Sequence, residues 1–524
     1  AALDVLLAEL EALCGPERAG FDRSRPPAFS GWGLDPEGTH AVGSERAGIT
    51  KASVGTLRLK WAFGFPGASR VRSPTSLAGG AIYTGSQEGR GYALDRETGC
   101  VRWHFDAPAE VRTTIVIEPW KTGDAAADPL AFFGDLAGNV FAVKAFTGQL
   151  VWQRRADEHP AAVLTASPAL HDGTLLVPVS SLEEASAAAP GYPCCSFRGS
   201  VVALDARTGA VKWRRWMVDE AVPQGEAPGG GQRMGPSGAA IWGTPAVDGP
   251  RGQLYIATSN NYSEPASAMS NAIVALDLET GAVRWHHQTL PGDVWNVDCH
   301  SRTSGACPEK PGPDYGFGAA TILGTAQGGR SLVLAGQKSG WAFAVDPADG
   351  TLVWKRRVGR GGIAAGIYFG MAATDGALFV PVSDRPDGVA SDMPPAPGLY
   401  ALDIESGAFA WKAPAANGCT DGRPACDPGL GGAITATPEL VFAGADDGWL
   451  RIHDARTGTV LWQFDTVRGF DTVNGVAARG GAISGGAAPI VHDGQLIVAS
   501  GYGFASKMPG NALLVFETGQ AGGR

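Results

Sequence analysis

The sequence predicts an all-β protein, an eight-bladed β-propeller whose last blade is closed by strands from both ends of the chain. A motif built from Ala-Leu-Asp, Thr-Gly and Trp recurs along the chain. Its full copies end at Trp103, Trp152, Trp213, Trp285, Trp354, Trp411 and Trp462. One more copy is split between LRLKW, which ends at Trp61, and LLVFETG at residues 513–519. Glycine supplies 75 of 524 residues, which is typical of many turns between short strands.

Each copy of the motif has a simple physical interpretation. The apolar run is a strand, and Asp-x-x-Thr-Gly is a tight turn in which glycine supplies the positive φ. The following strand carries the tryptophan, whose ring can pack between neighbouring sheets. One unit cannot bury both of its faces alone, so the units must stack.

The spacing of the tryptophans predicts where the chain carries extra loops. A four-stranded blade needs about 40 to 50 residues. The gaps between Trp152 and Trp354 are longer, at 61, 72 and 69 residues. We expect these insertions to form loops on one face of the ring, and such loops are the first place to search for a site.

The domain organisation follows from the same pattern. Residues 31–524 are predicted to form one propeller domain, for which 44% hydrophobic residues and 15 tryptophans provide a large core. Residues 1–30 are predicted to be a helical or linker segment, because LDVLLAELEAL at residues 3–13 has the periodicity of a short amphipathic helix.

The charge and hydropathy of the chain exclude some partners. The net charge is -10 at pH 7, which argues against nucleic acid and is compatible with a basic protein partner. No apolar run is long enough to cross a bilayer, so we expect no membrane span.

The cysteines suggest an oxidising compartment. They are Cys14, Cys100, Cys194, Cys195, Cys299, Cys307, Cys419 and Cys426. Three pairs lie close in sequence, one of them vicinal, which leaves Cys14 to pair with Cys100. We expect disulfides and therefore a periplasmic or secreted protein, although buried free thiols in a cytosolic protein are the alternative. The chain has no CxxCH motif for a haem of its own.

The tryptophan repeats resemble those of the quinoprotein alcohol dehydrogenases. GWGLD at 31–35, LRLKWAFGFPGA at 57–68 and PCCSFRGSVVALD at 193–205 are most similar to the polyvinyl alcohol dehydrogenase branch. The resemblance implies pyrroloquinoline quinone (PQQ), a bound Ca²⁺ or lanthanide ion, an alcohol substrate and a cytochrome c that accepts the electrons.

The resemblance also implies which residues bind the metal and stack on the quinone. Glu183 matches a metal-binding glutamate better than Glu184, and Asn260 matches a metal-binding asparagine, with Asn261 as the alternative. Carboxylate and amide oxygens suit Ca²⁺. Trp242 matches the tryptophan beneath the quinone. The structural alternatives are a solvated loop acid, an ordinary turn and another packing tryptophan.

Further polar residues match positions that contact the cofactor. Thr165 and Arg112 match contacts near the anionic carboxylates, for which charged donors are well suited. Lys338 matches a cation at the quinone oxygens, with a part in catalysis, and Asn474 is a further candidate contact. Polar residues at strand ends and surface ion pairs are the alternatives.

The vicinal pair Cys194-Cys195 is a candidate roof over the quinone. Methanol-oxidising relatives carry a vicinal disulfide at the position that corresponds to Val116-Ile117 here, so that ring is absent from its usual place. Cys194-Cys195 instead follows Glu183 within an insertion, and a simple loop staple is the alternative.

The catalytic base is where the sequence departs from the family. Asn296 stands where methanol-oxidising relatives carry the catalytic aspartate, and an amide cannot accept a proton at neutral pH. Asn296 therefore remains only a candidate metal ligand. Asp298 lies two residues on and is our first choice as base or metal ligand, and Asp293 is the second choice.

The resemblance implies oxidation of secondary alcohols, including polymers such as polyvinyl alcohol, to ketones or aldehydes by hydride transfer to C5 of the quinone. One alternative is a non-catalytic propeller that binds partner proteins. Another is a quinoprotein of the same fold that acts on sugar or toxin alcohols.

Overall fold

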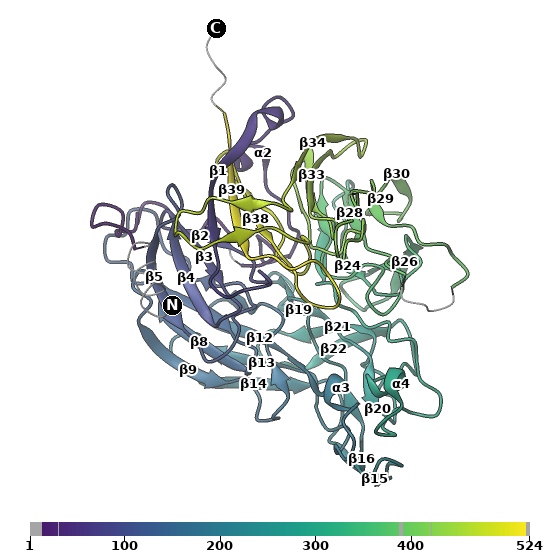
Figure 1. Cartoon of the computed structure of the whole chain (residues 1–524). Coiled ribbons are helices and arrows are strands. Elements are labelled where there is room, and N and C mark those ends of the chain that lie inside the picture. The colour runs from purple at the N-terminus through teal and green to yellow at the C-terminus, as the bar shows by residue number, and fades with distance from the viewer. Residues whose placement is uncertain (1–12, 30, 387–390, 421, 520–524) are drawn as a thin grey trace.

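A computed structural model describes residues 13–29, 31–386, 391–420 and 422–519, and confirms the predicted eight-bladed propeller (Figure 1). Seven of its blades are four-stranded sheets and one has five strands. All pairings between neighbouring strands of a blade are antiparallel. The helix predicted over residues 3–13 lies outside the described residues, except for Leu13 at its end.

The first four blades follow one another along the chain. Blade 1 contains β2 (Ser76–Ala78), β3 (Ala81–Gly85), β4 (Arg90–Asp95) and β5 (Val101–Asp106). Blade 2 contains β6 (Val116–Ile117), β7 (Leu130–Gly134), β8 (Asn139–Lys144) and β9 (Leu150–Arg155). Blade 3 contains β10 (Ala162–Val163), β11 (Ala169–His171), β12 (Thr174–Ser181), β13 (Ser200–Asp205) and β14 (Val211–Trp216). Blade 4 contains β18 (Ala246–Asp248), β19 (Gln253–Ala257), β21 (Ala272–Asp277) and β22 (Val283–Gln288).

The remaining blades complete the ring. Blade 5 contains β23 (Ile322–Thr325), β24 (Ser331–Gly336), β25 (Trp341–Val345) and β26 (Leu352–Arg357). Blade 6 contains β27 (Ala372–Thr374), β28 (Ala377–Val382), β29 (Gly398–Asp403) and β30 (Phe409–Pro414). Blade 7 contains β31 (Thr435–Ala436), β32 (Leu440–Gly444), β33 (Trp449–Asp454) and β34 (Val460–Asp465). Blade 8 contains β37 (Ile490–His492), β38 (Gln495–Ser500), β39 (Ala512–Thr518) and, from the N-terminal part, β1 (Leu57–Gly64).

The split repeat closes the ring as predicted. Strand β1 pairs antiparallel with β39, from Leu57 opposite Thr518 to Gly64 opposite Ala512. The outer strand of blade 8, β1, comes from the N-terminal part of the chain, whereas the other three strands come from the C-terminal part. Blade 8 therefore cannot unfold without separating β1 from β39. This closure also covers the edge that β39 would otherwise expose.

The repeated tryptophans join each blade to the next. Trp103 Nε1 donates to Ala145 O at 2.9 Å, and six other repeat tryptophans donate to carbonyls in the same way. The glycine of the following blade lies against the indole: a Cβ at Gly148 would be 2.8 Å from Trp103 Cε3. The turn therefore needs glycine for its positive φ and also for this close approach.

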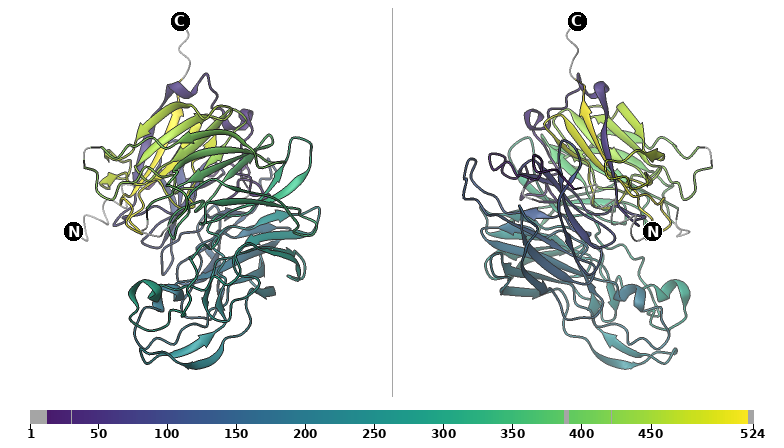
Figure 2. Two further views of the ribbon diagram at one scale, coloured as in Figure 1. Left: turned by 90° about the vertical axis from the view of Figure 1, so that its right-hand side faces the viewer. Right: turned by 60° about the vertical axis from the view of Figure 1, so that its left-hand side comes forward.

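The long insertions gather into one lobe at the lower right of Figure 1, which Figure 2 shows projecting below the blades. Its elements are α3 (Glu183–Ser186), β15 (Val222–Glu226), β16 (Gln232–Gly235), β17 (Ser237–Gly238), β20 (Asn261–Ser263) and α4 (Asp298–Ser301). The prediction that the third to fifth gaps form loops on one face is therefore confirmed.

Four disulfides form as expected, joining Cys14 to Cys100, Cys194 to Cys195, Cys299 to Cys307 and Cys419 to Cys426. Short elements complete the described structure, namely α2 (Ser44–Ala47), the 3-10 turn η1 (Val54–Thr56), β35 (Gly469–Phe470) and β36 (Ala478–Arg479). Within the described ranges, no helix has the length and hydrophobicity needed to cross a membrane.

Candidate active site

A cavity of about 390 Å³ lies where the insertion lobe meets loops of other blades. The lobe contributes residues from the α3 and α4 regions, and the loops before β27 and β39 contribute aromatic side chains. Exposed Phe504 and Leu182 lie on its lining, together with buried charged groups. An apolar enclosure with a few convergent charged groups is the usual form of a small-molecule site.

Trp242 is one of the aromatic residues that line the cavity, and its stacking on a quinone remains a prediction. It follows β17 and lines the cavity. Tyr368 packs edge-on against its ring at 6.1 Å between centroids, and Lys338 Nζ lies 5.6 Å from the ring centroid. An indole face beside a cation suits a flat, electron-poor, anionic ligand.

Lys338 forms a buried ion pair with Asp314, a residue that the sequence analysis missed. Lys338 Nζ lies 2.8 Å from Asp314 Oδ1, and the two side chains are 3% and 5% exposed. Burial raises the pKa of Asp314 well above its ordinary value, although the Lys338 charge opposes that rise. Asp314 stands in a non-repetitive loop with φ of 58°, so no strand periodicity could have singled it out.

The glutamate of the cavity is Glu184, and the preference for Glu183 over Glu184 is not supported. The carboxylate of Glu183 accepts the backbone N–H groups of Ser196 and Phe197 at 2.8–3.1 Å and is completely buried outside the cavity lining. Glu184 lines the cavity. Burial raises the pKa of Glu184, while the Lys338 charge and a hydrogen bond from Asn260 act against that rise.

Asn260 contacts Glu184 from behind the cavity lining, which does not include Asn260 itself. Asn260 Nδ2 donates to Glu184 Oε1 at 3.2 Å and to the carbonyl of Trp295 at 3.0 Å. A carboxylate and a carboxamide therefore stand side by side, which are donor types that a hard cation binds. In the described part of the chain, no three His, Cys, Asp or Glu side chains cluster as a metal site. Glu184 thus lies on the cavity lining, with Asn260 directly behind it, where Asn260 Oδ1 accepts from Ser259 Oγ at 2.7 Å. The neighbouring Asn261 instead bonds Ser237 O through its amide.

Asn296 and Asp298 do not line the cavity, contrary to the expectation. Asn296 Nδ2 donates to Tyr262 O and Ala306 O, while Asn296 Oδ1 accepts Asp298 N–H. Asp298 accepts N–H groups of Ser304 and two further loop residues. Burial acts to raise the pKa of Asp298, but these hydrogen bonds outweigh it and hold the pKa far below its ordinary value. An amide and a carboxylate so engaged stabilise the α4 loop.

The carboxylate of Asp293 is also occupied by hydrogen bonds from other residues of the protein. Its carboxylate accepts Asn271 Nδ2 and the backbone N–H groups of Asp314 and Tyr315 at 2.9–3.1 Å, and it is absent from the cavity lining. Burial raises its pKa. Asp293 thereby positions the loop that carries Asp314.

Arg112 and Thr165 have unused hydrogen-bonding capacity at the cavity. The Thr165 hydroxyl is buried and has no partner among the described residues. No described carboxylate forms an ion pair with Arg112, and Glu110 pairs instead with Arg70 and Arg72 at 2.6–2.7 Å. Burial and the Arg72 charge lower the pKa of Arg112. An unpaired guanidinium beside an unsatisfied hydroxyl fits the carboxylate of a ligand.

Two other predicted contacts lie away from the cavity. Cys194 and Cys195 are buried in an apolar cluster that includes Tyr262, and neither sulfur lines the cavity. The disulfide therefore supports the wall and does not form a roof. Asn474 exchanges two hydrogen bonds with the backbone of Gly64 and so holds strand β1 in place.

Comparisons with known families agree with this architecture. The family profile described as glucose/ethanol/alcohol dehydrogenase, beta-propeller domain, matches residues 32–306. A second profile, described as outer membrane protein assembly factor BamB, matches residues 338–515.

Individual alcohol dehydrogenases are also similar to this chain. The chain is 38% identical to a polyvinylalcohol dehydrogenase of Pseudomonas sp, covering 96% of this chain and 80% of that protein. It is 36% identical to another from Sphingopyxis sp. (strain 113P3), covering 95% and 76%. Among solved structures, quinohemoprotein alcohol dehydrogenase from Comamonas testosteroni superposes with a TM-score of 0.69 at 20% identity, covering 95% of this chain and 81% of that one.

Proposed function

The chain belongs to the PQQ-dependent β-propeller alcohol dehydrogenase family, near its polyvinyl alcohol dehydrogenase members, and we propose that it oxidises secondary alcohols, including polymeric ones, at the cavity beside Trp242. The polymeric substrate is suggested by the names of its relatives. The observation that carries the proposal is the buried Asp314–Lys338 pair on a cavity wall that also holds Glu184.

The cavity residues fit the cofactor that the family implies. PQQ, when bound, supplies an electrophilic quinone that accepts a hydride equivalent from the alcohol carbon. Trp242 would stack on its flat ring system, and Arg112 with Thr165 would bind a carboxylate. Lys338 would donate a hydrogen bond to an oxygen at the reacting end. These roles use the indole of Trp242 and the unpaired donors of Arg112 and Thr165, all of which line the cavity.

Asp314 is the group that we assign as the catalytic base. Its ionised Oδ atoms can accept the hydroxyl proton of the alcohol, and Lys338 at 2.8 Å stabilises the ionised form before that transfer. Asp314 lines the cavity, whereas Asp293 and Asp298 do not. An aspartate from another loop thus takes the role that Asn296 cannot perform.

Glu184 and Asn260 are the residues that would hold a metal ion. Ca²⁺ takes about six to eight oxygen ligands, so two protein side chains would leave places for cofactor and water oxygens. A lanthanide is also a hard cation and suits the same oxygen donors. The ion would polarise an oxygen of the bound cofactor as a Lewis acid.

The electron acceptor and the compartment follow from the same family. We infer that a cytochrome c receives the electrons, as the resemblance to the quinoprotein alcohol dehydrogenases implies. Four disulfides support a periplasmic or secreted location.

Reconstitution tests the proposal. Purified protein is mixed with PQQ and either Ca²⁺ or a lanthanide, and dye reduction is followed with secondary alcohols of increasing length. We expect dye reduction that requires both PQQ and metal. Protein that binds PQQ and metal yet oxidises no alcohol would contradict the proposal and favour a non-catalytic propeller.

A further inference from the structure

Lys507 is a second buried cation on the wall of the cavity, and none of the roles above uses it. It follows β38 in the loop of blade 8 and lines the cavity. Lys507 Nζ lies 2.7 Å from Asp446 Oδ2 and 2.8 Å from Ser484 Oγ. The side chains of Lys507 and Asp446 are both 1% exposed. A lysine is buried to this extent only when specific partners offset the loss of hydration.

The ammonium group of Lys507 retains one donor for a ligand. An ammonium has three N–H donors, and Asp446 and Ser484 account for two. The rings of Tyr368 and Tyr502, which also line the cavity, have their centroids 5.6 and 5.7 Å from Nζ. Because Lys507 lines the cavity, its third N–H is available to an acceptor there.

The backbone of blade 7 leaves space for this cluster. A Cβ at Gly431 would lie 2.3 Å from Lys507 Nζ, 2.6 Å from Asp446 Oδ2 and 2.9 Å from Ser484 Oγ. Such separations are too short for any side chain, so an alanine here would displace the ammonium group. Gly431 thus allows Lys507 to take this position.

We propose that Lys507 binds a carboxylate of the quinone cofactor, as a contact additional to Arg112 and Thr165. The inference rests on the proposed function, because it takes PQQ as the ligand. An ionised donor binds a carboxylate about twice as strongly as a neutral donor would, whereas a neutral alcohol needs no cation. Asp446, whose pKa is raised by burial, fixes the ammonium while its Oδ1 has no partner among the described residues. Blade 8, in which β1 pairs with β39, then takes part in holding the cofactor.

Equilibrium titration with PQQ, without alcohol or dye, tests Lys507 directly. Quenching of tryptophan fluorescence gives the dissociation constant of PQQ for Lys507→Met and Gly431→Ala. We expect Lys507→Met to raise that constant by about tenfold or more, which corresponds to one charged hydrogen bond. We expect Gly431→Ala, which keeps every charged group and only displaces Nζ, to raise it by about fivefold.

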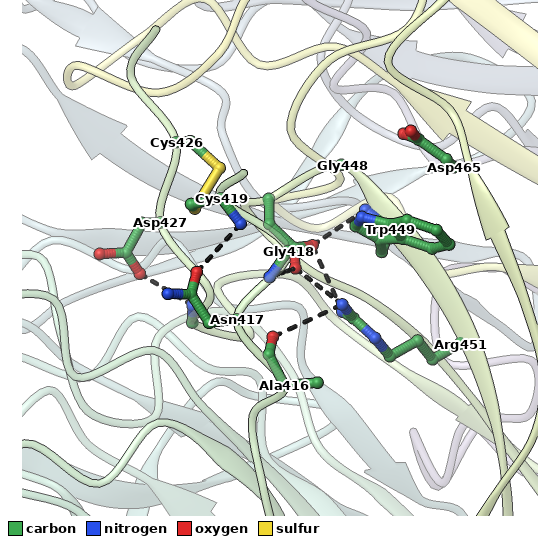
Figure 3. Close-up of polar contacts among 12 residues, drawn as sticks. Ala416, Asn417, Gly418, Cys419, Cys426, Asp427, Gly448, Trp449, Arg451 and Asp465 are labelled. Atoms are coloured by element: carbon green, nitrogen blue, oxygen red, sulfur yellow. Dashed lines mark hydrogen bonds and ion pairs between the residues drawn. A yellow bond between two sulfur atoms is a disulfide. The ribbon is translucent and has the colours of Figure 1, made fainter. Parts of the chain in front are cut away.

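The neighbouring ion pair in blade 7 provides matched controls. Asp447 follows Asp446 but pairs with Arg451 at 2.8 Å, and Arg451 is absent from the cavity lining. Figure 3 shows the Arg451 side chain directed toward Ala416 and Gly418. Asp447→Asn and Arg451→Met break another buried ion pair, at 0% and 8% exposure, whose aspartate is adjacent to Asp446. We expect both variants to bind PQQ with the wild-type constant.

The outcomes separate this inference from the proposed function. Wild-type protein that does not bind PQQ would overturn the cofactor assignment itself. Wild-type binding that Lys507→Met and Gly431→Ala both preserve would overturn only the role of Lys507, and a changed KM for alcohol would then assign it to the substrate. If Lys507→Met does not fold, as judged by circular dichroism, Gly431→Ala decides the question by the same titration.

Discussion

Lys338 Nζ lies 2.8 Å from Asp314 Oδ1, and both side chains are almost completely shielded from water. Burial raises the pKa of Asp314, and the ammonium charge partly offsets that rise. Burial favours the protonated carboxyl, and the ammonium charge favours the ionised one. A group under both influences can accept a proton and release it again, as a general base must do in each turnover. The pair is therefore the basis of our assignment of Asp314 as the base.

Asp314→Asn should lower kcat by about a thousandfold, because the amide cannot accept the hydroxyl proton. Binding of PQQ, measured by titration, should change little. Asp293→Asn and Asp298→Asn are the comparison variants, and each should lower stability more than kcat. Loss of kcat in Asp298→Asn together with a normal rate in Asp314→Asn would restore our sequence-based choice of base.

Glu184→Gln should raise the Ca²⁺ concentration needed for activity by at least about tenfold, since it removes a charged oxygen ligand from the cavity wall. Glu183→Gln is the adjacent control. Its carboxylate binds the N–H groups of Ser196 and Phe197, so this change should lower the melting temperature and leave the Ca²⁺ requirement unchanged. Activity is measured against free Ca²⁺ in a chelator-buffered series. If Glu183→Gln raises the Ca²⁺ requirement and Glu184→Gln does not, Glu183 is the metal ligand.

The propeller could be predicted from sequence because each copy of the repeat contains both halves of a contact. The tryptophan of one blade meets the glycine turn of the next, so the spacing alone specified the stacking. The residues of the candidate active site do not recur at a regular spacing along the chain. Helix α3 turns the side chains of Glu183 and Glu184 in different directions, and this difference depends on tertiary contacts of the 194–197 segment. Asp314 reaches the cavity through a loop held by Asp293, which no local pattern reveals.

Asp298 should act as a pH-dependent stabiliser of the α4 loop. Its pKa is lowered in the folded state, so its contribution is complete above the unfolded value of about 4 and declines as the pH falls below it. Asp298→Asn should destabilise the protein by about 2 kcal/mol at pH 7. The difference in melting temperature between this variant and wild type should shrink as the pH is lowered from 4. A difference independent of pH would contradict an ionised role.

Gly209→Ala should destabilise the junction between blades 2 and 3. Its φ is 69°, and a Cβ there would lie 2.8 Å from Trp152 Cδ2. Gly173 has nearly the same φ, 70°, but nothing lies within 4 Å of its Cβ position. Gly173→Ala therefore reports backbone strain alone, and Gly209→Ala should cost about 1–3 kcal/mol more through overpacking. Urea unfolding measures both variants, and equal losses would mean that the indole does not restrict the turn.

Phe504→Ala should impair long alcohols more than short ones. Phe504 is 50% exposed on the cavity lining and continues a row of aromatic rings through Tyr502, Phe369 and Tyr368 to Trp242. Only a substrate that extends from Trp242 to the cavity mouth can cover its exposed half.

Covering that surface is worth about 1 kcal/mol, so KM for a polymeric or long-chain secondary alcohol should rise about fivefold while KM for a short one stays constant. Val222, which is 56% exposed on β15 and absent from the cavity lining, provides the control substitution Val222→Ala. Equal effects of Phe504→Ala on short and long alcohols would show that the row does not bind the substrate chain.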